Sequence, residues 1–243
     1  MVTEPATLDL DDALRLLRDG ELSVEGRPYD ASNATLYCTV TLDGVTSACV
    51  HKPIAGERPL WDFPDGTLAF REVAAYVVSA ASGWDIVPPT VMRDGPFGLG
   101  MCQLWIDIDE SVDLAALARS GHEQLRRMAV FDAVVNNADR KGGHLLPTTD
   151  GHIFGVDHGV CFSVEDKLRT LLWRWRGRPL TVEAIDVLSG LRAQMEGELG
   201  MALRELLAPE EVAATILRMD RLLTSCRHPL PSDEWPPVPW PPF

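Results

Sequence analysis

N-N-A-D-R-K-G-G-H at residues 136–144 and F-G-V-D-H-G at residues 154–159 are the two stretches that decide the fold. They place Asp139 and Asp157 18 residues apart, on either side of short apolar runs that predict a hairpin with its turn at Asp150-Gly151. Phosphoryl transfer needs one carboxylate near the acceptor hydroxyl and a second that holds magnesium on the nucleotide phosphates. The pair therefore predicts a phosphotransferase centre, with Asp139 as the catalytic carboxylate and Asp157 as a metal ligand.

The first stretch also follows the D-x-K-x-x-N spacing of kinase catalytic loops. Asp139 is followed by Lys141 and then by His144, which stands where kinases usually carry an asparagine that binds metal. We expect Lys141 to neutralise charge on the transferred phosphoryl group and His144 to be a second metal ligand. Taken singly, Asp139 also fits a solvated loop carboxylate and Asp157 a turn residue. Their joint spacing favours the kinase-like interpretation.

Two residues nearer the N-terminus extend this pattern. Of the 22 cationic residues only three are lysines, and one of them, Lys52, ends the apolar run SACVHK. The lysine of V-A-I-K ends a strand in the same way and contacts the nucleotide phosphates. Glu72 lies 20 residues later in a helix predicted between Thr67 and Gly83, and we expect it to orient Lys52, with Glu57 as the competing carboxylate. A surface lysine and an exposed helix charge are the alternatives.

The other nucleotide contacts are predicted from weaker signals. The segment DASNATL, residues 30–36, contains no glycine, so Ser32 and Asn33 would cover the phosphates together with backbone amides. The adenine would pack against the segment GMCQLWID, where Gln103 and Trp105 offer backbone groups at the connector between two lobes. Simple core packing explains Trp105 equally well.

The order of predicted elements indicates an α+β fold of the two-lobed, protein-kinase-like type. Residues 1–105 form a β-rich N-lobe that binds nucleotide and contains one inserted helix, and residues 106–228 form a mainly helical C-lobe that carries the two loops. Its last helices are expected at residues 181–189, 191–207 and 209–225, broken at Gly190 and Pro209. The tail, residues 229–243, has 7 prolines and predicts an extended, polyproline-type segment that lies on the chain's own surface or on a partner.

The two loops resemble the catalytic and metal-binding loops of the phosphoinositide 3-/4-kinase-like family, in which D-R-H-x-x-N precedes I-D-F-G or I-D-H-G. More distantly they are similar to HipA-type bacterial kinases. The resemblance follows the element order over roughly residues 20 to 220 and implies ATP with Mg²⁺, or Mn²⁺, as cofactors. Lys141 and His144 depart from the family's histidine and asparagine. His144 and the missing glycine loop leave open a pseudokinase that binds nucleotide and serves as a scaffold.

Composition limits the compartment and the partners. The 243 residues carry a formal net charge of −14, contain no apolar run of membrane-spanning length and begin with an acidic segment, which predicts a cytoplasmic protein without stable membrane insertion. The negative charge disfavours nucleic acid as a partner.

Five scattered cysteines predict reduced, mostly buried thiols. A hydrolytic metal centre is the least favoured alternative, because the spacing of its candidate ligands matches no zinc motif: His122, His144, Asp157 and His158.

A local basic patch predicts the charge of the phosphate acceptor. Residues 167–179, KLRTLLWRWRGRP, hold five of the 22 cations and follow Asp157, where kinases place the segment that receives the acceptor. We expect Arg174, Arg176 and Arg178 to bind an anionic acceptor, either a soluble metabolite or a protein rather than a membrane lipid. An exposed segment whose arginines pair with the abundant carboxylates is the alternative.

Overall fold

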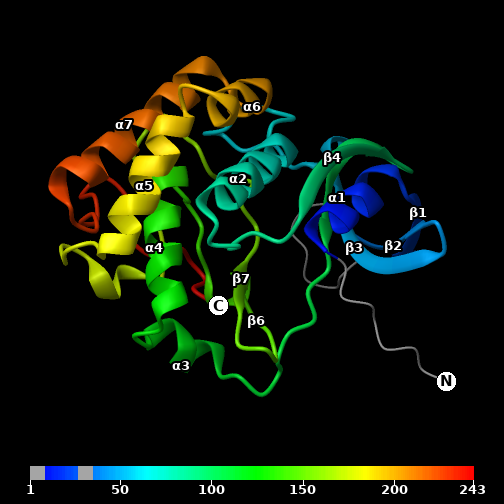
Figure 1. Ribbon diagram of the computed structural model, residues 1–243, viewed down its shortest axis with the longest axis horizontal. Coiled ribbons are helices and arrows are strands. Elements are labelled where there is room, and N and C mark those ends of the chain that lie inside the picture. Colours follow the sequence, from blue (N-terminus) through cyan, green and yellow to red (C-terminus); the bar gives the residue numbers. More distant parts are fainter. Residues whose placement is uncertain (1–8, 27–34) are drawn as a thin grey trace.

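A five-stranded antiparallel sheet forms one end of the molecule, and most helices gather at the other (Figure 1). The computed structural model describes residues 9–26 and 35–243, and the elements below belong to these residues. The sheet has the order β1-β2-β3-β5-β4. Its strands are β1 Glu21–Gly26, β2 Leu36–Leu42, β3 Val45–Pro53, β4 Thr90–Gly95 and β5 Gly98–Leu104.

The β2–β3 hairpin sets the register that positions Lys52. Asp43 and Gly44 form its two-residue turn with φ of 52° and 81°, a conformation that Asp-Gly sequences favour. From this turn the pairing runs unbroken, and β3 then pairs with β5 so that Lys52 lies opposite Met101. Helix α1, Leu10–Asp19, packs Leu16 and Leu17 against the apolar side chains of this sheet.

Helix α2, Leu68–Ser82, lies between the sheet and the other helices (Figure 1). Its Ala69 and Val73 pack against Met101 of the sheet, whereas its Ala74 and Val78 belong to the large core of the helical part. The helix ends at Gly83, which has φ 68°, as the sequence predicts. A helix that is buried on both sides holds its side chains in a fixed position relative to both parts.

The side chain that caps α2 does not come from the residue before the helix. Thr67 occupies the cap position, but its hydroxyl donates to the Pro64 carbonyl. The carboxylate of Glu57 instead accepts from the amides of Leu68 and Ala69 at 3.1 and 2.8 Å. A carboxylate suits this place because the first amides of a helix have no partner within it.

The helical part surrounds a small two-stranded hairpin. Its elements are α3 Leu114–Arg119, α4 Glu123–Val135, β6 Leu145–Pro147, β7 Ile153–Gly155, α5 Val182–Gln194, α6 Glu198–Leu206 and α7 Pro209–Ser225, with single helical turns at Gly142–His144 and Trp173–Trp175. The predicted break at Gly190 is wrong, since α5 continues to Gln194. Gly190 is exposed, and the buried Leu188 and Leu191 beside it keep the helix on the core at the modest cost of one glycine.

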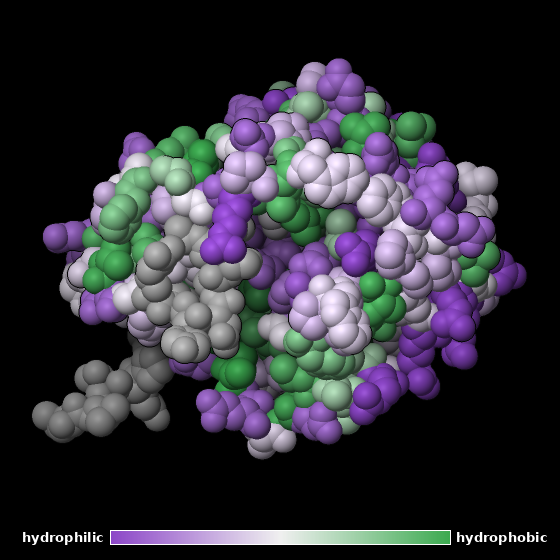
Figure 2. All heavy atoms as spheres, turned by 180° about the vertical axis from the view of Figure 1, so that it is seen from behind, coloured by the Kyte–Doolittle hydropathy of each residue, from purple (hydrophilic) through white to green (hydrophobic). Residues whose placement is uncertain are grey.

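None of the helices in the described residues is both long and apolar enough to cross a bilayer. On the face shown in Figure 2, hydrophobic side chains are scattered among hydrophilic ones, and hydrophilic side chains lie in a hollow near the middle.

All five cysteines are free, and four are buried as predicted. The fifth, Cys226, is exposed at the end of α7.

Candidate active site

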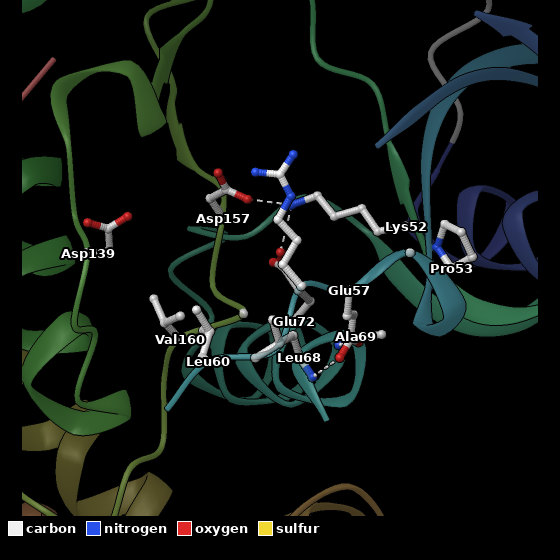
Figure 3. A pocket seen from close by; sticks show the side chains of 13 residues that line it. Lys52, Pro53, Glu57, Leu60, Leu68, Ala69, Glu72, Asp139, Asp157 and Val160 are labelled. Carbon is white, nitrogen blue, oxygen red and sulfur yellow. Dashed lines mark hydrogen bonds and ion pairs between the residues drawn. The ribbon is translucent and has the colours of Figure 1, made fainter. Parts of the chain in front are cut away.

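Lys52 and Glu72 meet between the sheet and helix α2. The ammonium of Lys52 lies 2.8 Å from Glu72 Oε1 and also pairs with Asp157 (Figure 3). Burial alone would lower the pKa of Lys52, but the charges of Asp157 and Glu72 outweigh it and raise that pKa above its ordinary value. Glu72 is buried, and its second oxygen accepts the amide of His158 at 2.8 Å. Glu72 therefore holds both the lysine and the loop after β7.

Asp157 follows β7 in a left-handed backbone conformation with φ 64°. Such a conformation is uncommon outside glycine, although aspartate tolerates it better than most residues, and it is often found at functional sites. The carboxylate is 53% exposed and points toward Lys52 (Figure 3). The charge of Lys52 holds the pKa of Asp157 well below its usual range, so the group is ionised at neutral pH.

His144 lies beside the same carboxylate. Its Nε2 is 3.4 Å from Asp157 Oδ2, and its Nδ1 accepts the amide of Lys141 at 3.4 Å. Burial lowers the pKa of His144, so the ring is neutral, and an accepting Nδ1 leaves the proton on Nε2. In this tautomer His144 donates toward Asp157. It can bind a metal through Nε2 only in the other tautomer.

Asp139 and Lys141 form a second pair on the loop between α4 and β6. Lys141 Nζ lies 3.0 Å from Asp139 Oδ2, and both side chains are partly exposed. Asn137 fixes the start of this loop, because its Oδ1 accepts the amide of Asp139 at 2.9 Å while its Nδ2 donates to Asp132 at 3.1 Å. The sequence motif contains this asparagine, but its spacing does not indicate the role.

A buried ion pair lies beneath the two loops. Arg140 and Asp132 are both fully buried and lie 2.9 Å apart, and Arg140 also donates to the Val156 carbonyl at 3.1 Å. Arg140 Nη2 lies 2.6 Å from Nε2 of His158, whose pKa is held well below its ordinary value by burial and then by this guanidinium. Arg140 thus joins the Asp139 loop to the Asp157 loop. Neither Asp132 nor Arg140 was expected from the sequence to have this role.

A cavity of about 240 Å³ brings the main predicted residues together. Lys52, Glu72, Asp139 and Asp157 line it (Figure 3), and Asp139 faces Asp157 across the space. Arg58 also lines the cavity, and no motif in the sequence points to it. The cavity therefore combines two cations with carboxylates from both loops.

Several predicted nucleotide contacts lie elsewhere. Gln103 does not line the cavity, and its buried side chain donates to Thr90 at 2.8 Å. The amide of Trp105 is bonded to the Ala48 carbonyl, and its half-exposed ring packs edge-to-face on Tyr37. The connector thus uses these groups within the chain. Ser32 and Asn33 lie outside the described residues.

The basic segment is only partly available to an acceptor. Lys167 is buried and lies 3.1 and 3.2 Å from carboxylate oxygens of Asp62 and Glu165, so its charge is neutralised inside the chain. The side chains predicted to bind the acceptor are exposed but do not line the cavity: Arg174, Arg176 and Arg178. The structure therefore separates this arginine patch from the cavity, and its role stays a prediction.

The donor set fits a metal ion that is shared with phosphate groups. Among residues 9–26 and 35–243, no three His, Cys, Asp or Glu side chains cluster so as to enclose a metal by themselves. Mg²⁺ needs no such cage, since it is commonly held by one or two carboxylates together with substrate phosphates and water. The ionised, exposed carboxylate of Asp157 meets that requirement, with His144 beside it.

Known proteins resemble this chain in sequence and in fold. The family described as "Phosphatidylinositol 3- and 4-kinase" matches residues 115–218. "Protein Rv2133c" of Mycobacterium tuberculosis is 43% identical over 96% of each chain. "Phosphatidylinositol 4-kinase gamma 4" of Arabidopsis thaliana is 28% identical over 65% of this chain but only 33% of its own length. The solved structure of hydra Fam20 with sugar superposes with a TM-score of 0.60 at 13% identity, covering 93% of this chain and 91% of the other.

Proposed function

The chain belongs to the phosphatidylinositol 3- and 4-kinase-like family, and on that premise we propose that it is an ATP- and Mg²⁺-dependent kinase that phosphorylates an alcohol group of a soluble, anionic acceptor. The observation that carries the proposal is the shared cavity. In it Lys52 contacts both Glu72 and Asp157, and Asp139 lines the same space. A phosphate-binding cation, a metal-binding carboxylate and a catalytic carboxylate are the parts that phosphoryl transfer requires.

Lys52 and Asp157 have the nucleotide-binding roles. The ammonium of Lys52 is shared between Glu72 and Asp157. A phosphate oxygen would replace Asp157 as a partner of Lys52, while Glu72 keeps the ammonium in place. A metal ion bound at Asp157, with His144 as the second expected ligand, would neutralise charge on the phosphates and align them. Arg58 adds a second cation to the same cavity.

Asp139 and Lys141 have the transfer roles. Asp139 accepts the hydrogen bond of the acceptor hydroxyl and orients or deprotonates it. Lys141, 3.0 Å from Asp139, supplies positive charge where the phosphoryl group passes. The Asn137 contact to the Asp139 amide and the Arg140 contact to Val156 hold the two loops in register for this step.

The acceptor is proposed to be a soluble anionic metabolite or protein. The relative from Arabidopsis is named for phosphatidylinositol, yet this chain carries a formal net charge of −14, which repels an anionic bilayer. The exposed arginines at 174, 176 and 178 are the proposed contacts for the acceptor's charge. The five free thiols support the cytoplasm as the proposed location, because that compartment keeps thiols reduced.

A nucleotide-binding scaffold without transfer activity is the second candidate. The observation that favours it is His144, whose tautomer directs a proton rather than a lone pair toward the metal position. The two candidates differ in turnover and not in nucleotide binding.

The experiment compares the parent chain with Asp139→Asn. Binding of Mg-ATP is followed by thermal stabilisation, and transfer of label from [γ-³²P]ATP is measured to water and to a panel of anionic metabolites and peptides. We expect both chains to bind Mg-ATP and the variant to lose transfer by about 10² to 10⁴-fold. Equal transfer by both chains would exclude the mechanism, and binding without transfer by the parent would favour the scaffold.

A further inference from the structure

The proline-rich tail lies along the body of the protein and receives a row of hydrogen bonds from it. In Figure 1 the C-terminus lies in the interior of the view beside β6 and β7. Four donors of the body reach three tail carbonyls: Arg169 Nε to Pro236 at 3.2 Å, Thr170 N to Pro237 at 3.0 Å, Trp173 Nε1 to Pro237 at 2.7 Å and Gly142 N to Pro242 at 2.8 Å. We call the surface formed by Gly142, Arg169, Thr170 and Trp173 the tail groove.

The direction of these bonds matches the chemistry of proline. Every bond in this row has its donor on the body and its acceptor on the tail. Proline has no N–H, and an extended polyproline segment leaves its carbonyls free to accept. A groove that presents donors therefore suits a proline-rich segment better than an ordinary strand, whose own amides would be left without partners.

Two aromatic residues anchor the part of the tail at residues 235–243, one at each end of it. Trp235 lies over the buried ammonium of Lys167, 4.7 Å from the centre of the indole, and stacks on Trp61 at 6.1 Å between ring centres. The rings of Trp61 and Phe63 face the same ammonium at 5.1 and 5.7 Å. A partly desolvated cation among three rings gives each contact more strength than it would have in water.

The second anchor is the terminal residue. The ring of Phe243 packs so closely on Gly142 that a Cβ at position 142 would lie 2.0 Å from the Phe243 ring. Any larger residue at position 142 would displace the ring from this place. The fit of Gly142 and the rings around Lys167 are separate observations, and both indicate a built docking surface.

The tail groove adjoins the proposed transfer machinery. Gly142 directly follows Lys141, and Arg140 pairs with the chain at Thr170, since its amide donates to Arg169 and its carbonyl accepts from Leu171. An extended polypeptide that presents a side chain to Asp139 would cross this surface. The tail does not line the cavity that Lys52, Asp139 and Asp157 share, so it meets the Asp139 loop at Gly142 and leaves nucleotide access open.

We propose that the tail groove is a recognition surface for a proline-rich, extended segment, and that the chain's own residues 235–243 occupy it and shield the Asp139 loop from polypeptide acceptors. The shielding part rests on the proposed function, whereas recognition of the tail does not. Exposing the loop to a protein acceptor then requires the tail to leave.

The test uses the full chain with one of two tryptophan substitutions in the tail. Trp235→Ala removes the ring that lies on Lys167, and the matched control Trp240→Ala removes a ring that is 85% exposed. Hydrogen exchange of the Gly142 and Thr170 amides is the first measurement. We expect exchange to become about tenfold faster in Trp235→Ala and to stay unchanged in Trp240→Ala. A synthetic peptide of residues 229–243 should restore the protection of Trp235→Ala, and a peptide with alanine at 236 and 237 should not.

Unchanged exchange in Trp235→Ala, or equal effects of the two substitutions or of the two peptides, would overturn the proposal that the groove recognises the tail.

The second measurement is transfer from [γ-³²P]ATP to a serine- and threonine-containing peptide library. Faster transfer by Trp235→Ala with unchanged Mg-ATP affinity supports shielding, and slower or equal transfer overturns it. If neither the parent nor the two variants bind Mg-ATP, the proposed function and the shielding fail together. The exchange result alone then decides whether the groove recognises the tail.

Discussion

Asp132 and Arg140 form an ion pair of 2.9 Å in which neither side chain has any exposed surface. The pair lies where the Asp139 loop and the Asp157 loop meet, and Arg140 bonds to both a carboxylate of α4 and a carbonyl before Asp157. The two loops that carry the proposed chemistry therefore share one buried support.

Breaking this pair should destabilise the fold strongly. Asp132→Ala leaves the Arg140 guanidinium buried without its counter-ion, which typically costs about 3–5 kcal/mol in the free energy of unfolding. Urea unfolding measures the loss. The control is Asp166→Ala, which removes the exposed ion pair with Arg221 at 2.5 Å and should have a far smaller effect. Similar losses for both variants would show that the buried pair has no special importance.

Asp157 should be required for metal-dependent binding of nucleotide. Asp157→Ala removes the ionised carboxylate that pairs with Lys52, so Mg-ATP should no longer raise the melting temperature of the chain. Thermal unfolding with ATP alone, Mg²⁺ alone and both together separates the contributions. If the variant is stabilised by Mg-ATP as much as the parent is, Asp157 is not the metal ligand.

His144 should influence which metal ion supports transfer. Mg²⁺ prefers oxygen ligands, whereas transition metals such as Mn²⁺ accept an imidazole nitrogen. His144→Asn supplies an oxygen, so the ratio of kcat/KM with Mg²⁺ to that with Mn²⁺ should rise by about tenfold. An unchanged ratio would mean that His144 acts only as the hydrogen-bond donor that faces Asp157 at 3.4 Å.

The arginine patch should affect the acceptor and not the nucleotide. Replacing Arg174, Arg176 and Arg178 by alanine removes three exposed cations that do not line the cavity. The KM for an anionic acceptor should rise while Mg-ATP affinity is retained, and the parent's acceptor KM should increase with salt. Robust phosphorylation of phosphatidylinositol in vesicles by the triple variant would contradict both the acceptor class and the role of the patch.

His228 should make stability depend on pH. Its ring is buried, and burial together with Arg126 lowers its pKa to about 4. Between the ordinary histidine pKa of about 6.5 and this value, the unfolded chain binds a proton that the folded chain does not. Stability should therefore fall as pH drops from about 6.5 toward 4, by up to about 1.4 kcal/mol per pH unit for this group.

Urea unfolding at a series of pH values checks this, with His228→Phe as the variant that keeps a ring near Trp175 but cannot titrate. The variant should show a shallower loss of stability in acid. Parallel pH profiles for the parent and the variant would show that His228 makes no such contribution.

Local patterns predicted most elements and the main residues of the site. The β6–β7 hairpin and α2 follow from turn residues and from the apolar periods of strand and helix, which depend only on neighbours in the sequence. Helix α5 shows where this reasoning fails, because Gly190 is a breaker by composition while burial of its neighbours decides the outcome. Glu57 and Glu72 were both candidates for Lys52, and only the packing of α2 separates them.

The sequence by itself determined the order of strands and helices, the two loops with Asp139 and Asp157, and the strand-end position of Lys52, because each is written in residues close together in the chain. The tertiary structure alone decided that Glu72 contacts Lys52 while Glu57 caps α2, that Lys167 is buried rather than offered to an acceptor, and that the tail lies against Gly142. These outcomes depend on burial and on partners distant in sequence, and a charge or a ring acquires its role only when packing determines which groups it meets.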